Sequence, residues 1–281
     1  MADGAYRWQG MAPAPDPARV EAIDAAWDDD QAHAFAEPAR HAAVERLERA
    51  LAAARTGDLT EAAAQLTHAR SVLDGLDPAA LEPRRGLAGL FDSRGARLKR
   101  FRAAYDRAAA GLAEAARAVA ERIEAAGRRS DALDDAWNAL RDAVADLDAH
   151  LSVAARRLLG HAPAEDEPPH PLHARRQTLD ACRAAALHAL PLVRGVQGAD
   201  ARSAEALKTC AEGLTAWRED WKTALGLSGR RPKRVRPDRE HLARGRDEAL
   251  RRLDAALGEL TAARARRAEV EGRMAELRRP L

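Results

Sequence analysis

The sequence predicts an all-α fold: an elongated helical bundle built on a long antiparallel coiled-coil hairpin, with no sheet. The first observation is composition, because the 281 residues are 46% hydrophobic and 32% charged but only 4% aromatic. Such a profile is typical of long helices and coiled coils. The second observation is apolar spacing that alternates between three and four residues, which keeps one seam of a helix against a partner helix. The third is that two such seams flank a short segment containing Gly127.

The central hairpin is predicted over residues 96–159, one seam to each helix. The first seam consists of Leu98, Phe101, Tyr105, Ala108, Leu112, Ala115 and Val119. The second consists of Leu133, Trp137, Leu140, Val144, Leu147, Leu151, Ala154 and Leu158. Between the seams, Gly127 is expected to take the left-handed position after the first helix, and Ser130 or Asp131 to cap the second.

Prolines, glycines and apolar spacing divide the rest of the chain. The expected segments are a disordered tail (1–16), an N-terminal helical hairpin region (17–78), a connector (79–95), a central long-helix bundle (96–227), a basic linker (228–237) and a C-terminal helix (238–281). In the N-terminal hairpin, Gly57 and Asp58 are expected to form the turn and Asp58 to cap the second helix. Its sequence is similar to one tetratricopeptide repeat, but an ordinary helical hairpin explains the same pattern.

The last part of the central bundle is predicted to be interrupted twice. Pro191 is expected to kink or end a helix that begins near Leu172, and a second break is expected between Gly195 and Ala201. Cys182 and Cys210 fall on apolar helix faces, where a thiol behaves as a small buried hydrophobe. Two cysteines at this spacing provide neither a disulfide framework nor a zinc pair.

Charge is distributed unevenly along the chain. The formal net charge is +2, yet residues 228–281 hold 16 Lys and Arg against 9 Asp and Glu. A basic end can bind nucleic acid or an anionic membrane, whereas interspersed acids favour a solvated helix face. The most basic stretch, 230–236, has no aromatic residue for base stacking, so nucleic-acid binding is disfavoured and peripheral membrane contact stays open.

No segment carries a recognisable catalytic motif. The chain has no Gly-rich phosphate loop, nucleophile elbow or paired Glu-x-x-His ligands, which favours a protein that is not an enzyme and needs no cofactor. Residues 161–173 combine three histidines with three carboxylates and could hold a divalent cation. Their four prolines are more typical of a crossing between helices, so no metal is predicted. The N-terminus lacks a secretion signal, and the chain has no apolar run of about 18 residues, which favours the cytoplasm.

Several motifs resemble the TelA-like toxic anion (tellurite) resistance family. The resemblance covers roughly residues 74–215. A Leu-Asp-Pro connector at 76–78 precedes Gly-Leu-Phe at 89–91, and Leu-Val-Arg-Gly-Val at 192–196 is followed by Ala199 and Ala-Leu-Lys-Thr at 206–209. Where the family has a run of threonines, this chain has residues 200–203, of which Ser203 retains a hydroxyl.

The resemblance implies a non-enzymatic cytoplasmic helical protein that acts through protein partners in resistance to tellurite or similar stress. The alternative is a tetratricopeptide-like helical adaptor or scaffold with no role in anion resistance. Arg194, Gly195, Ser203 and Lys208 are the candidate contacts to an anion or partner. An anion would meet Arg194 and Lys208 together with the amides of a helix beginning near residue 200 or 202. Otherwise these two cations are solvated, or pair with Asp200 and Glu205.

Overall fold

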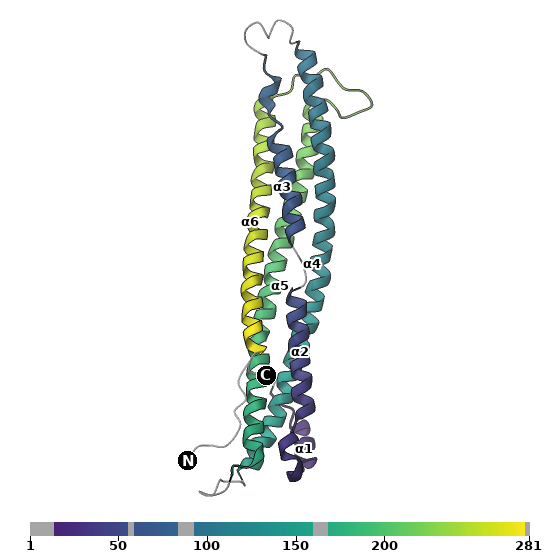
Figure 1. Cartoon of the computed structure of the whole chain (residues 1–281). Helices are drawn as coiled ribbons and strands as arrows, with labels where there is room; N and C mark the ends of the chain where they lie inside the picture. Colours follow the sequence, from purple (N-terminus) through teal and green to yellow (C-terminus); the bar gives the residue numbers. More distant parts are fainter. Residues whose placement is uncertain (1–13, 56–58, 84–92, 160–167, 279–281) are drawn as a thin grey trace. The chain divides into compact units, whose positions relative to one another are not determined.

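The computed structural model describes residues 14–55, 59–83, 93–159 and 168–278. Within these ranges the regular structure is entirely helical and no strand occurs, which confirms the all-α prediction. Figure 1 labels the helices. In chain order, the elements are α1 (Pro17–Ala25), η1 (Asp29–Ala34), α2 (Glu37–Arg55), α3 (Thr60–Asp74), η2 (Pro78–Leu81), α4 (Arg94–Leu158), α5 (Pro171–Ala224) and α6 (Arg239–Arg278).

The helices pack into two compact units. The first unit comprises residues 1–56, 129–199 and 266–281, and the second comprises 57–128 and 200–265. Helices α4, α5 and α6 each contribute residues to both units. The predicted helical bundle is therefore confirmed, and no helix in the described part of the chain is apolar enough over a sufficient length to cross a membrane.

The first unit has an aliphatic core. Its largest cluster draws buried residues from α2, α4, α5 and α6, including Leu47, Leu51, Leu133, Leu140, Val144, Leu190, Val193, Val196 and Met274. Smaller clusters continue it: Leu147 and Leu151 pack with Leu179 and Cys182, and Val20 and Ile23 of α1 pack with Val153. Burial of these side chains is the main force that holds the helices together, at roughly 1.5–3 kcal/mol per large aliphatic residue.

The second unit contains an aromatic cluster formed by Phe101 and Tyr105 of α4 and Trp217 and Trp221 of α5. Ring centroids lie 5.8 Å apart for Phe101 and Trp221, and 5.0 Å apart for Trp217 and Trp221. Tyr105 Oη donates a hydrogen bond of 2.6 Å to the carbonyl of Arg218. On each helix the two aromatic residues are four positions apart, about one turn, so their ring contacts fix the register of α4 against α5.

The predicted hairpin over residues 96–159 is wrong, because these residues belong to one uninterrupted helix, α4, of 65 residues (Figure 1). Both predicted seams are real: Phe101, Leu112 and Val119 are buried, as are Leu133 and Leu147. They lie along a single helix. Gly127, Ser130 and Asp131, which were expected to form a turn and a cap, are ordinary interior positions of that helix.

The reason for the continuity is visible in the heptad phase. Val119 and Leu133 are two heptads apart with Ala126 midway, so one face continues through the glycine without a shift. A glycine inside a helix costs about 1 kcal/mol relative to alanine, far less than the burial gained on both sides. The local turn signal is therefore outweighed by packing.

Gly127→Ala is expected to raise the free energy of unfolding by about 0.5–1 kcal/mol, because an interior helix position favours alanine over glycine. A Cβ added at Gly127 meets nothing within 4 Å. Urea titration monitored by circular dichroism measures the change. Gly226→Ala is the matched control, since Gly226 has φ +68° and its added Cβ would lie 2.8 Å from Val235 Cγ1. The control should lose stability; a loss at Gly127 as well would contradict the continuous helix.

In the following region, the helix does not end at Pro191, and the break predicted between Gly195 and Ala201 is wrong. Helix α5 runs from Pro171 to Ala224 through Pro191 and through the whole 195–201 segment. A proline inside a helix removes one backbone hydrogen bond, at a cost of about 3 kcal/mol. Leu190, Val193 and Val196 next to it are almost completely buried, and their packing offsets that cost.

The ends of the shorter helices differ in whether a side chain caps them. The start of the predicted N-terminal helical region forms α1 and η1, and Asp16 caps α1 by accepting the Ala18 amide at 3.0 Å. Helix α3 begins after Leu59, which makes no side-chain cap; Asp58, the expected cap, lies outside the described residues.

Helices α2 and α3, which were expected to pair, belong to different units. The tail before residue 14 and the Gly-Leu-Phe motif at 89–91 also lie outside the described ranges.

Residues 228–237, the predicted linker, lie within the non-helical stretch between α5 and α6. Asp238 caps α6, since its Oδ1 accepts the amides of Glu240 and His241 at 2.9 and 3.2 Å. The C-terminal helix then runs without interruption through Arg264 and Arg267.

Candidate partner-binding site

The first unit holds the polar cluster that contains Arg194, the charged residue of the Leu-Val-Arg-Gly-Val segment. We call it the Arg194 cluster; its members are Ser130, Asp134 and Trp137 of α4, and Arg194 and Gln197 of α5. On each helix these residues are spaced by three or four positions, so they share one face. The cluster connects α4 with α5 above the aliphatic core.

Hydrogen bonds link four of the cluster's side chains, those of Ser130, Asp134, Arg194 and Gln197. Arg194 Nη1 donates to Asp134 Oδ1 and to Gln197 Oε1. The Gln197 amide nitrogen in turn donates to Ser130 Oγ at 2.9 Å. The guanidinium carbon of Arg194 lies 4.4 Å from the centroid of the Trp137 ring, within the range of a cation–π contact. These contacts hold the long Arg194 side chain in one orientation.

The cluster is accessible to a partner. The side chains of Arg194 and Asp134 are 41% and 46% exposed, and Trp137 is partly buried. The hydrogen bond from Arg194 lowers the pKa of the Asp134 carboxyl, with a smaller contribution from Gln197. An ion pair this exposed adds little to stability, so its main effect is to orient the guanidinium.

The motif around Arg194 has one buried and one exposed face. Val193 and Val196 are 0% and 1% exposed and belong to the aliphatic core. Gly195 is exposed, and a Cβ added there meets nothing within 4 Å. The surface next to Arg194 is therefore unobstructed, and a partner could approach the backbone of α5 closely at this point.

The predicted anion site is not assembled as expected. No helix begins near residue 200 or 202, because α5 is continuous there, so its amides are already used within the helix. Arg194 pairs with Asp134 on α4 rather than with Asp200. Arg194 and Gly195 belong to the first unit, whereas Ser203, which is buried, and Lys208, which is exposed, belong to the second. The four candidate residues do not form one described site.

Sequence reasoning missed the partners of Arg194. Trp137 was assigned to the hydrophobic seam, but two arginines stack on its ring, Arg194 at 4.4 Å and Arg141 at 5.7 Å. Asp134 precedes Trp137 by three residues and therefore shares its helix face. That spacing was the available signal, although it does not say which residue of another helix lies opposite.

Metal and thiol chemistry find little support in the described part of the chain. No group of three or more His, Cys, Asp or Glu side chains there could hold a metal ion. The first part of the histidine-rich segment, residues 161–167, lies outside the described ranges. Cys182 and Cys210 are free and buried, and burial raises the pKa of both thiols, that of Cys210 to about 11. This confirms the prediction that the thiols are packed in apolar surroundings.

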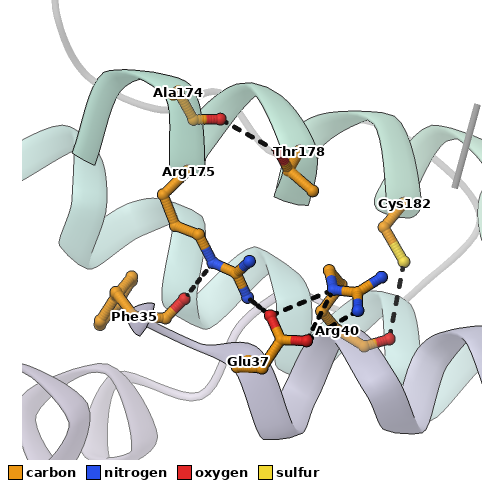
Figure 2. Close-up of polar contacts among 7 residues, drawn as sticks. All are labelled: Phe35, Glu37, Arg40, Ala174, Arg175, Thr178 and Cys182. Atoms are coloured by element: carbon orange, nitrogen blue, oxygen red, sulfur yellow. Dashed lines mark hydrogen bonds and ion pairs between the residues drawn. The ribbon is translucent and has the colours of Figure 1, made fainter. Parts of the chain in front are cut away.

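A second polar network anchors the start of α2 to α5 (Figure 2). Arg175 of α5 donates one hydrogen bond to the carbonyl of Phe35 and another to Glu37 Oε2. Arg40 holds the same carboxylate from the other side, with its Nη2 2.7 Å from Oε1. The Cys182 thiol lies 3.9 Å from the carbonyl of Arg40. Three charged groups thus fix the N-terminal turn of α2.

The network surrounds a strained residue. Ala36 has φ +57°, a left-handed conformation that costs a non-glycine residue about 1 kcal/mol. Arg175 binds the residues on both sides of Ala36, namely Phe35 and Glu37. The two contacts hold the chain in the sharp turn that leads from η1 into α2, which indicates a structural role for this network.

The network predicts a pH dependence of stability. The hydrogen bond from Arg40, assisted by Arg175, lowers the pKa of Glu37 from 4.5 to about 2. Stabilisation by a carboxylate with a lowered pKa is complete above its unfolded pKa and is lost as the pH falls towards the folded value. Glu37→Gln is therefore expected to cost about 1 kcal/mol at neutral pH, a value limited by solvent screening of this half-exposed carboxylate. The cost should shrink between about pH 4.5 and pH 2.

Urea titrations of wild type and Glu37→Gln at matched pH values measure that difference. The other carboxyl groups are present in both proteins, so their contributions to the difference in the free energy of unfolding largely cancel. Glu45→Gln provides a control, because Glu45 makes an exposed ion pair with Arg49 on the same helix. A difference between wild type and Glu37→Gln that does not change with pH would show that Glu37 is not held as a charged group.

Comparisons with known proteins leave the family open. No protein-family description matches the chain, and neither the curated proteins nor the solved structures contain a match.

Proposed function

We propose that this protein is a non-enzymatic cytoplasmic helical protein of the toxic-anion resistance type, which acts through protein partners. The observation that supports the proposal is the Arg194 cluster, where an oriented, accessible arginine lies on a tryptophan ring within the segment that resembles the family. Tryptophan and arginine are the residue types that most often dominate binding energy at protein interfaces.

The contacts of Arg194 favour a protein partner over a small anion. A tellurite or phosphate ion would have to compete with the Asp134 carboxylate, which already binds Arg194 Nη1. A protein surface can instead cover the exposed part of the guanidinium and the Trp137 ring while the Asp134 contact is kept. An interface also benefits from preorganisation, because less side-chain entropy is lost on binding. A membrane surface is a separate candidate partner, for the basic C-terminal region.

The proposal can be tested in a tellurite-sensitive bacterial host. Expression of the wild-type chain is expected to raise the tellurite concentration that the host tolerates, and the Trp137→Ala, Arg194→Ala double variant is expected to lose most of that gain. Arg49→Ala is the matched control, since Arg49 is an exposed arginine of the first unit outside the cluster. Immunoblots must show equal protein levels. No gain from the wild-type chain would overturn the resistance function.

Two further measurements separate a partner mechanism from anion binding. A photoreactive amino acid placed at the open Gly195 position is expected to crosslink one host protein, and the adduct should disappear in the Arg194→Ala background. Binding isotherms of the purified wild type with tellurite, phosphate and sulfate are expected to show no saturable binding. Saturable tellurite binding that depends on Arg194 would replace the partner mechanism with direct anion binding.

A further inference from the structure

The basic linker between α5 and α6 forms a defined surface of the second unit. Residues 228–237 contain five cations, Arg230, Arg231, Lys233, Arg234 and Arg236, and no acidic residue. All five side chains are exposed. A run of this kind is usually a mobile connection, so its significance depends on whether its path is fixed.

Contacts to the backbone fix the path of the linker. The Lys233 amide donates to the carbonyl of Gly226 at 2.8 Å and closes the loop. Arg102 of α4 donates to the carbonyl of Leu225 at 2.6 Å and to that of Lys233 at 2.7 Å. Gly226 has φ +68°, and Val235 packs so closely against it that an added Cβ would lie 2.8 Å from Val235 Cγ1.

The start of α4 adds a further cation to this surface. Arg94 Nη2 donates to the carbonyl of Val235 at 3.4 Å, which brings the first turn of α4 beside the linker. Among the described residues, no ion pair involves Arg94 or any of the five linker cations, although ion pairs are numerous elsewhere on these helices. Six positive charges from two distant parts of the sequence are thus held together without carboxylate partners.

We infer that this surface, Arg94 with residues 230–236, binds the anionic phosphate headgroups of a lipid membrane. Each Lys or Arg near an anionic bilayer adds to the attraction, and clusters of four to eight such residues are typical of proteins that associate with membranes peripherally. The apolar side chain of Val235 points into the loop, so attachment is electrostatic and reversible by salt. This surface shares no residue with the Arg194 cluster and does not depend on the function proposed for it.

Lipid is favoured over nucleic acid because of what surrounds the cations. Proteins that hold single strands present exposed aromatic side chains for base stacking. Here the four aromatic residues of the second unit that the structure describes, Phe101, Tyr105, Trp217 and Trp221, are buried in its core. Residues 228–237 contain five cations and no aromatic residue, which suits a surface of uniform negative charge.

Vesicle sedimentation with the full chain tests the inference. The wild type is expected to bind vesicles of phosphatidylcholine with about one-third phosphatidylglycerol at low salt, and to be released at high salt. A triple variant, Arg230→Gln, Arg231→Gln, Arg234→Gln, should bind these vesicles about tenfold or more weakly than the wild type. The matched control, Arg244→Gln, Arg251→Gln, Arg273→Gln, removes the same charge from exposed positions of α6 and should bind like the wild type.

Three results would overturn the inference. They are equal binding to vesicles of phosphatidylcholine alone, equal weakening in the control variant, and tighter binding to a duplex DNA or single-stranded RNA oligomer than to anionic vesicles at the same salt and phosphate concentration. The last result would assign the surface to nucleic acid. Circular dichroism should show unchanged helicity in both variants, because all six substituted side chains are exposed.

Discussion

Trp221→Ala is expected to lower the free energy of unfolding by about 3–5 kcal/mol, the usual cost of removing a large buried aromatic side chain. Trp221 is 0% exposed and is in ring contact with Phe101, Tyr105 and Trp217. Gly245 of α6 closes the other side, since a Cβ added there would lie 3.1 Å from Trp221 Nε1. Helices packed on several sides cannot readily collapse into the space, so the cavity adds to the lost burial.

Two tryptophan variants make the expectation specific. Trp221→Phe keeps most of the ring and removes an indole N–H that has no hydrogen-bond partner in the described structure, so it should cost less than half as much. Trp137→Ala, in the first unit, removes an only partly buried ring and should also cost less than Trp221→Ala. Denaturant titration gives all three values. If Trp221→Ala costs no more than Trp137→Ala, the aromatic cluster is not the tightly packed core of the second unit.

The apolar periodicity of the sequence predicted most of the buried side chains of α4, although Leu98 and Trp137 are only partly buried. Leu112 and Val119 of one seam and Leu140 and Leu147 of the other are at most 2% exposed. Periodicity indicates which face of a helix is covered by its neighbours, and the apolar side chains on that face are the ones that become buried. It does not report how many helices share the pattern.

The number of helices was predicted wrongly because the turn signal at Gly127 was given more weight than the continuous heptad phase on both sides of it. Gly127 followed by Ser130 and Asp131 matches the chemistry of a turn and a cap. The two heptads between Val119 and Leu133 keep one face continuous, which a turn would not generally preserve. The break predicted at Gly195 failed for the same reason, since Val193 and Val196 on either side are buried on one face of α5. Tertiary packing outweighs such local preferences.

The candidate site could be predicted only in part. Arg194 stood out in the sequence because its neighbours resemble a family motif, and the structure shows it partly exposed on α5. Its contacts to Asp134 and Trp137 depend on the pairing of α4 with α5, which no local pattern specifies. The charge of the linker at 228–237 was evident in the sequence. The hydrogen bonds that fix its path were not, because Arg94 and Arg102, which donate them, are distant in the sequence.

Arg183→Met is expected to destabilise the protein by about 3–5 kcal/mol at neutral pH, because it leaves the carboxylate of Asp148 buried without its ion-pair partner. Asp148 of α4 is 0% exposed, and Arg183 of α5, itself 12% exposed, donates to its Oδ1. Burial raises the pKa of Asp148 even with Arg183 present, and nearby Asp180 adds to the effect. Removing Arg183 should raise that pKa further.

The pH dependence distinguishes an unpaired charge from a simple loss of packing. A carboxyl whose pKa is raised on folding takes up a proton in the folded state first, so the folded form gains stability as the pH falls. The deficit of Arg183→Met relative to wild type should therefore shrink from about pH 7 towards about pH 5. The double variant Asp148→Leu, Arg183→Met should recover most of the lost stability at neutral pH, because a buried ion pair can be replaced by apolar residues at little cost.

Arg49→Met is the matched single variant, since it breaks the exposed pair with Glu45 and should cost less than about 1 kcal/mol at every pH. Denaturant titrations of wild type, Asp148→Leu, Arg183→Met and the double variant at two pH values complete a double-mutant cycle for Asp148 and Arg183. If Arg183→Met loses the same stability at both pH values and the double variant loses more than either single variant, the loss comes from packing of the arginine stem. The buried carboxylate would then not be the cause.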